Sequence, residues 1–123
     1  MDHQAINHEE VWEIWCKSWK VTNPEEKTAL FRTCLDTVCQ YHDPLAKVDG
    51  WQQIMSYMAE FHERFPGAYF VTTEFLTHGD KSIARWEMRG DNDIVLGDGM
   101  SYGEYTDQGR LKQMTGFFPV PAD

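Results

Sequence analysis

The most informative segment of the chain is residues 41–67, which read YHDPLAKVDGWQQIMSYMAEFHERFPG. In its second half, apolar side chains recur at positions i, i+3, i+4 and i+7, which is the period of an amphipathic helix. These side chains are Trp51, Ile54, Met55, Met58, Phe61 and Phe65. Asp49 suits the N-cap of this helix, with Gln52 reaching back to it, and Pro66-Gly67 suits its end. The segment therefore predicts a helix over residues 50–65.

The residues before this segment predict two further helices. An apolar stripe with the helical period runs through residues 11–19 and includes three tryptophans. A break follows, in which Asn23 suits an N-cap, Pro24 the first helical position and Glu26 the reciprocal position of a capping box. The second helix then carries Leu30, Phe31, Cys34 and Leu35, and its apolar stripe can be continued to Val38.

The remainder of the chain predicts strands. Residues 38–48 contain strand-compatible side chains, and Asp43-Pro44 breaks any helix there, so we expect a short strand or hairpin. Four segments rich in β-branched and aromatic residues follow and are separated by turns. They are residues 68–78, 83–89, 97–106 and 110–118. Helices followed by an antiparallel meander predict an α+β fold in which the N-terminal helices pack on one face of the sheet.

Length and charge limit the possible functions. The chain has 123 residues, which predicts one domain over residues 1–123. It has 11 Lys and Arg against 20 Asp and Glu, a formal charge of −9. Nucleic acid and anionic membranes both need a basic surface, so neither is expected as a partner. The sequence contains no apolar run near the ~20 residues that cross a bilayer.

The cysteines and histidines predict neither a metal site nor a cofactor. Cys16, Cys34 and Cys39 form no CxxC pair, and no two histidines combine metal-ligand spacing with a carboxylate. The N-terminus has no basic and apolar regions of a signal peptide. We therefore expect three reduced thiols in a cytoplasmic protein.

The order of these elements, with several short motifs, resembles the nuclear-transport-factor-2-like superfamily in its SnoaL-like branch. The motifs are Tyr41-His42-Asp43-Pro44, Asp49-Gly50-Trp51, residues 83–90 (IARWEMRG), residues 107–111 (DQGRL) and residues 115–118 (TGFF). The resemblance implies a strongly curved sheet around the third helix, forming a cone-shaped barrel with one apolar pocket at its open end. Ketosteroid isomerases and polyketide cyclases belong to this superfamily, and many members are homodimers through the outer sheet face.

The resemblance to ketosteroid isomerases makes Asp43 the candidate base, because a catalytic Asp is followed there by Pro. At the mouth of an apolar cone a carboxylate loses solvation, which suits it to abstract a proton next to a carbonyl. Ser101 falls where the isomerase has its second, protonated Asp, and Tyr41 shares the strand face of Asp43. The catalytic candidates are thus Asp43, Tyr41 and Ser101. The plainer interpretation is that Asp43 is a turn residue favoured before Pro.

Strand alternation and the helical stripes predict which side chains face the pocket. Trp86 and Met88 should face inward, whereas Arg85 and Glu87 should face outward and form cross-strand ion pairs or a dimer surface. The predicted ligand-pocket residues are Trp15, Trp19, Met55, Met58, Trp86, Met88, Tyr105, Met114 and Phe118. Aromatic and thioether side chains suit a flat hydrophobic ligand.

Three functions remain open. The first is a small cofactor-free isomerase, cyclase or dehydratase that moves a proton on a hydrophobic carbonyl compound. The second is a non-catalytic module that binds a small apolar molecule in the same cone, and it predicts that the polar groups of the pocket do not converge. The third is an interaction domain that dimerises or binds another protein through the outer sheet face. It predicts a filled cone and an apolar outer patch around Ile83, Tyr102 and Phe117.

Overall fold

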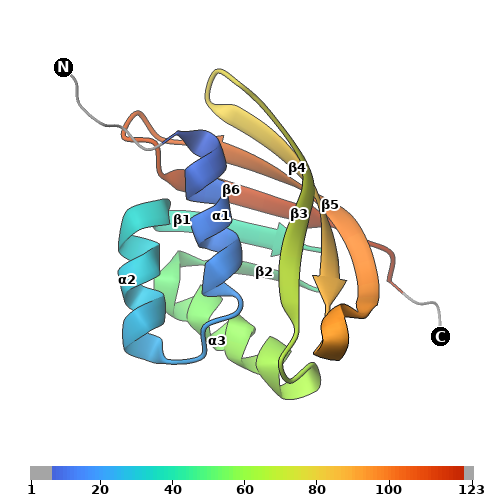
Figure 1. Cartoon of the computed structure of the whole chain (residues 1–123). Coiled ribbons are helices and arrows are strands. Elements are labelled where there is room, and N and C mark those ends of the chain that lie inside the picture. Colours follow the sequence, from blue (N-terminus) through green and yellow to red (C-terminus); the bar gives the residue numbers. More distant parts are fainter. Residues whose placement is uncertain (1–6, 121–123) are drawn as a thin grey trace.

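The computed structural model describes residues 7–120 and has the α+β fold that the sequence predicts. Its helices are α1 (His8–Ser18), α2 (Pro24–Cys34) and α3 (Gly50–Arg64). Its strands are β1 (Leu35–Asp43), β2 (Ala46–Asp49), β3 (Tyr69–His78), β4 (Lys81–Arg89), β5 (Val95–Tyr105) and β6 (Leu111–Phe117), with a 3₁₀ turn, η1 (Asp91–Asp93), before β5. Figure 1 shows the three helices on one side of the sheet, with the strands curving around them.

The sheet is curled but not closed into a barrel. Its strand order is β2-β1-β6-β5-β4-β3, so β2 and β3 form the two edges. Neighbouring strands are antiparallel except β1 and β6, which run parallel. The sheet is therefore mixed, where the sequence predicts an antiparallel one. The last strand returns beside the first, with Tyr41 opposite Met114, and no local sequence signal specifies a pairing over that separation.

The predicted hairpin around residues 38–48 is present, but its first strand is longer than predicted. β1 starts at Leu35, directly after the last residue of α2. β1 and β2 then pair across the turn that contains Pro44, with Asp43 opposite Ala46. The hairpin thus places Asp43 at the end of a strand, next to a tight turn.

The cap of α2 follows the sequence except that Glu26 makes no reciprocal side-chain bond to Asn23, and the cap of α3 differs from the prediction. Asn23 Oδ1 accepts a hydrogen bond from Glu26 N at 3.0 Å, and Pro24 occupies the first turn of α2, as predicted. Asp49 is at the N-cap of α3, but its side chain makes no capping hydrogen bond. Gln53 instead accepts from Asp49 N at 2.8 Å, so the predicted contact with Gln52 is wrong by one residue.

The core lies between the helices and the concave face of the sheet. Alternation along β4 is as predicted, since Ala84 is buried whereas Ile83 is 45% exposed. The largest fully buried side chains come from both layers: Trp12, Tyr105, Phe31, Leu35, Ile54, Met58, Leu111 and Met114. Within residues 7–120, no helix is both long and apolar enough to span a membrane.

Candidate functional site

A cavity of about 710 Å³ lies between the helices and the concave sheet face. This volume is within the range of small-molecule sites. The lining residues are Trp12, Trp15, Cys16, Trp19, Tyr41, Asp43, Leu45, Tyr57, Phe61, Arg64, Phe65, Phe70, Trp86, Met88, Leu96, Gly97, Asp98, Ser101, Phe118 and Pro119. Half of these side chains are aromatic, so the cavity presents ring faces and edges around a small number of polar groups.

The carboxylate of Asp43 is the best-connected polar group in the cavity. Its Oδ2 accepts hydrogen bonds from Tyr41 Oη at 2.7 Å and from Tyr57 Oη at 2.8 Å. Its Oδ1 accepts from Leu45 N at 2.8 Å and from Ala46 N at 3.0 Å, both in the turn after β1. Asp43 is therefore a turn residue, as the plainer interpretation holds, and at the same time part of the cavity wall.

Both tyrosines keep their protons over the physiological pH range. Burial raises the pKa of Tyr41 well above its ordinary value, and the charge of Asp43 raises it further. Burial, followed by the hydrogen bond to Asp43, also raises the pKa of Tyr57. Each phenol has one proton, and each donates it to Asp43. The phenolic oxygens consequently present lone pairs to the rest of the cavity.

A second polar pair lies on the neighbouring strands. Trp86 Nε1 on β4 donates to Ser101 Oγ on β5 at 2.9 Å. The Trp86 ring lies over Gly99, where a Cβ would be only 2.6 Å from Trp86 Cζ2. Because the indole N–H occupies one lone pair of Ser101, the hydroxyl proton of Ser101 is left for another acceptor.

The two polar groups converge around Gly116 on β6. A Cβ placed on Gly116 would lie 3.5 Å from Asp43 Cβ, 3.6 Å from Tyr41 Oη and 3.7 Å from Ser101 Oγ. Side chains from β1 and β5 therefore surround one point on the strand between them. The three predicted catalytic candidates, Asp43, Tyr41 and Ser101, all line the cavity and meet at this point.

Aromatic rings form most of the remaining wall, with Trp19 at their centre. Its ring centroid lies 5.3 Å from that of Phe61, 5.5 Å from that of Phe70 and 5.8 Å from that of Tyr41. Phe70 in turn contacts Trp86 edge to face, with centroids 5.2 Å apart. Such interlocked rings have few rotamers open to them, so the wall is preorganised around the polar centre.

The structure places some predicted pocket residues in the lining and others behind it. Those in the lining are Trp15, Trp19, Trp86, Met88 and Phe118. Met55, Met58, Tyr105 and Met114 face the same interior but pack at its filled end. Met58 Sδ accepts a hydrogen bond from Lys27 Nζ, and Tyr105 Oη is bonded to Ser82 Oγ at 2.8 Å. Strand alternation and the helical period predict which side chains face the interior. They do not predict how far from the cavity opening each side chain lies.

The sequence interpretation missed Tyr57, Phe70, Arg64 and Asp98. Tyr57 matters most, because it supplies the second phenol on Asp43. The signal was present: Tyr57 lies three residues after Ile54 and four before Phe61, which places it on the apolar face of α3. Arg64 and Asp98 are exposed, and the side chain of Asp98 shares the outer face of the sheet with Glu87, which lies opposite it.

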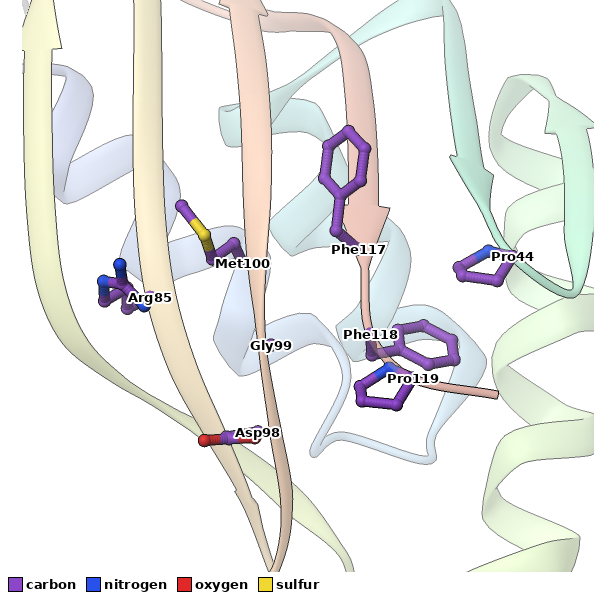
Figure 2. A pocket seen from close by; sticks show the side chains of 8 residues that line it. All are labelled: Pro44, Arg85, Asp98, Gly99, Met100, Phe117, Phe118 and Pro119. Carbon is purple, nitrogen blue, oxygen red and sulfur yellow. The ribbon is translucent and has the colours of Figure 1, made fainter. Parts of the chain in front are cut away.

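The outer face of the sheet bears charged and apolar side chains. Arg85 forms the predicted cross-strand ion pair, with its Nε 3.2 Å from Glu74 Oε1 on β3. Glu87 instead pairs with Arg89 two residues along the same strand, at 2.8 Å. Figure 2 shows a shallow depression on this side, where Met100 on β5 and Phe117 on β6 lie near the C-terminal residues Phe118 and Pro119.

The three cysteines are free and buried. Burial raises the pKa of Cys16 and of Cys39 to about 12, and it raises the pKa of Cys34 as well. Thiols in this state are poor nucleophiles and poor metal ligands. In the described part of the chain, no group of three or more His, Cys, Asp or Glu side chains is placed to hold a metal ion.

Comparison with known proteins gives a consistent result. The sequence profile of the SnoaL-like domain matches residues 19–118. A SnoaL-like protein of Agrobacterium tumefaciens C58, proposed to be an isomerase, has a similar structure with a TM-score of 0.84 at 21% identity; the match covers 92% of this chain and 97% of that one. No curated protein matches the sequence.

Two further solved structures are similar. A SnoaL-like protein of Jannaschia sp. CCS1, proposed to be a polyketide cyclase, has a TM-score of 0.73 at 14% identity, over 95% of this chain and 90% of that one. An NTF2-like protein of Cytophaga hutchinsonii has a TM-score of 0.70 at 13% identity, over 97% and 95%. At these identities the structural likeness shows the fold alone.

Proposed function

The chain belongs to the SnoaL-like domain family, and from that premise we propose that it is a cofactor-free enzyme that moves a proton on a hydrophobic carbonyl compound. The observation that carries the proposal is the convergence of Asp43 and Ser101 around Gly116, inside a cavity with aromatic walls. A base and a hydrogen-bond donor at one point are what enolisation requires. A purely binding cavity has no need for this pairing.

In the proposed reaction, Asp43 removes a proton from the carbon next to the carbonyl. The electron pair of the broken C–H bond forms a carbon–carbon double bond, and negative charge develops on the carbonyl oxygen. Ser101 donates its hydroxyl proton in a hydrogen bond to that oxygen, while Trp86 Nε1 holds Ser101 Oγ in place. When the substrate is a β,γ-unsaturated ketone the intermediate is a dienolate, and Asp43 returns the proton to its γ-carbon, which yields the conjugated isomer and restores the carboxylate. A saturated ketone takes the proton back on the same carbon and shows only hydrogen exchange.

Tyr41 and Tyr57 act in this scheme as positioning residues. Their hydroxyls hold Asp43 Oδ2 in one orientation while the carboxylate is charged. Once Asp43 has taken up the proton, the charge lies on the ligand oxygen instead. A phenol O–H rotates about its C–O bond, so either tyrosine can then donate its hydrogen bond to that oxygen instead of to Asp43.

Exchange of substrate hydrogen for solvent deuterium tests the proposal without knowledge of the product. A panel of enolisable hydrophobic ketones is incubated with the protein in D₂O and followed by NMR. We expect accelerated exchange for at least one ketone, and Asp43→Asn should abolish it. Asp107→Asn, which removes the same charge in the exposed β5–β6 turn, is the matched control. Exchange that survives Asp43→Asn would overturn the proposal.

One observation favours a non-catalytic binding module as the second candidate. Asp43 already accepts four hydrogen bonds from the protein, so it is fixed as part of the cavity wall whether or not it reacts. A binding module needs only the cavity. Tryptophan fluorescence separates the two candidates, because Trp15, Trp19 and Trp86 line the cavity. Ketones that quench this fluorescence but exchange no hydrogen favour the binding module.

We also propose that the protein is a homodimer through the outer sheet face. Leu76, Ile83 and Phe117 are 63%, 45% and 58% exposed there. The open cavity argues against an interaction domain with a filled cone. Light scattering should give the mass of a dimer for the wild type and of a monomer for Phe117→Asp. Ile94→Asp, at an equally exposed position after η1, should remain dimeric.

The proposed compartment is the cytoplasm. All three thiols are free and buried, which suits a reducing environment. Fractionation of cells that express the protein tests this directly.

A further inference from the structure

The protons around Asp43 are almost all committed to partners within the protein. The phenolic protons of Tyr41 and Tyr57 go to Asp43 Oδ2, and the indole proton of Trp86 goes to Ser101 Oγ. Beside Asp43 Oδ2 the site therefore presents a negative charge and the lone pairs of two phenolic oxygens, while the one uncommitted proton, on Ser101, lies across Gly116. A ligand atom that contacts Asp43 Oδ2 and the two phenols must carry positive charge or donate hydrogen bonds.

We propose that the cavity binds hydrophobic organic cations, tertiary or quaternary amines, with the charged nitrogen beside Asp43 and the apolar substituents among the aromatic rings. The inference rests on the proposed site but not on the proposed reaction. A bound cation occupies the carboxylate that the reaction needs, so such a ligand is expected to compete with the ketone.

The aromatic wall strengthens the case for a cation. The faces of aromatic rings carry negative charge, and a cation within ~6 Å of a ring centroid is attracted to it. The rings of Tyr41 and Tyr57, with centroids 5.8 Å apart, hold the two hydroxyls, and both rings lie near Trp19, at 5.8 and 6.2 Å. A cation beside Asp43 Oδ2 thus lies next to several rings as well as a carboxylate. Alkylated amines suit this site better than NH₄⁺, because their weaker hydration is easier to give up.

The net negative charge of the whole chain also favours a cation. The chain has a formal charge of −9, so cations are drawn towards the protein and anions are repelled. Asp98 lies opposite Glu87 on the outer face of β5 and contributes only to this long-range attraction. Arg64 is the guanidinium in the cavity lining. Arg64 is exposed, so water screens its effect, but it still opposes a cation. Its removal should therefore strengthen the binding of a cation.

Benzyltrimethylammonium and its uncharged carbon isostere, neopentylbenzene, form the test pair. They have the same shape and differ in charge, and neither can enolise. Binding is measured by quenching of tryptophan fluorescence at pH 7.5 and low salt. We expect the cation to bind about tenfold or more tightly than the isostere. Asp43→Asn should remove this difference. Arg64→Gln should tighten cation binding by about twofold and leave the isostere unchanged, whereas Lys112→Gln, at an exposed site on β6, should change neither.

The outcomes separate this inference from the proposed function. Equal affinity for the cation and the isostere overturns the inference, as does a cation preference that persists in a folded Asp43→Asn protein. If that variant does not fold, the Arg64→Gln and Lys112→Gln pair decides: equal effects of the two variants overturn the inference. Cation binding without exchange of any ketone supports the inference and refutes the proton-transfer function. Ketone exchange without cation binding supports the proton-transfer function and refutes the inference.

Discussion

Gly99 on β5 offers a sharp test of how Trp86 is seated. A Cβ at this position would lie 2.5 Å from the carbonyl oxygen of Phe117 and 2.6 and 2.7 Å from Trp86 Cζ2 and Cη2. Backbone and a large ring would both have to move, so Gly99→Ala should cost about 2–3 kcal/mol, as overpacking of a core does. In a chain of 123 residues this corresponds to a Tm lower by about 8–12 °C.

Gly116→Ala on the adjacent strand is the matched control, because its Cβ would meet neighbours only at ordinary contact distances of 3.5 Å and more. Its Tm should be unchanged or a few degrees higher, since Ala loses less backbone entropy than Gly on folding. Calorimetry of both variants is the assay. In a Trp86→Phe background the cost of Gly99→Ala should fall by about 1 kcal/mol, because the ring contacts are relieved while the carbonyl contact remains. A Gly99→Ala protein within about 2 °C of the wild type would refute this seating of Trp86, and with it the bond to Ser101.

Three further predictions concern single side chains. Ser101→Ala removes the donor to the developing oxyanion and the acceptor of Trp86 Nε1, so exchange in the most reactive ketone should fall by about 10²–10³, with the folded structure retained by circular dichroism. Tyr57→Phe removes one hydrogen bond to the charged Asp43, so chemical denaturation should give a free energy of unfolding lower by about 1.5–3 kcal/mol. Burial lowers the pKa of Lys27 from 10.5 to about 8, so between these values the unfolded chain binds more protons than the folded one. The stability of the wild type relative to Lys27→Met should therefore rise as pH increases from about 8 to 9, and a constant difference over that interval would contradict a buried Lys27.

The sequence predicts the fold well where the signals are local. The stripe from Trp51 to Phe65 specifies α3, and alternation along β4 places Ala84 inside and Ile83 outside. The parallel pairing of β1 with β6 has no such signal. It arises because β6 pairs with β5 on one side and β1 fills the other, which is a property of the whole sheet.

The candidate site is also predictable only in part, because its contacts join residues that are far apart in the sequence. The resemblance to ketosteroid isomerases suffices to place Asp43 and Ser101 at the cavity, but their hydrogen-bond partners depend on how deep each side chain lies. Tyr41 is two residues from Asp43, so its contact could be expected from strand alternation. Tyr57 reaches the same oxygen from a separate helix, across the interior. The sequence predicts that Met114 lines the pocket. It does face the interior, but it is only 1% exposed and packs in the core.

The hydrogen bonds on Asp43 connect the two proposals made for the cavity. Four donors fix the carboxylate in place even when no ligand is bound, so its geometry needs no rearrangement on binding. The same four donors surround the carboxylate while it is charged, and this arrangement suits a cation beside it. A neutral ketone reacts only if Ser101 donates a hydrogen bond to its oxygen, where negative charge develops. Ser101 is thus the residue on which catalysis depends and cation binding does not. Ser101→Ala should suppress ketone exchange while leaving the affinity for benzyltrimethylammonium within about twofold of the wild type, and an equal loss of both would show that the two ligands share more of the site than Asp43.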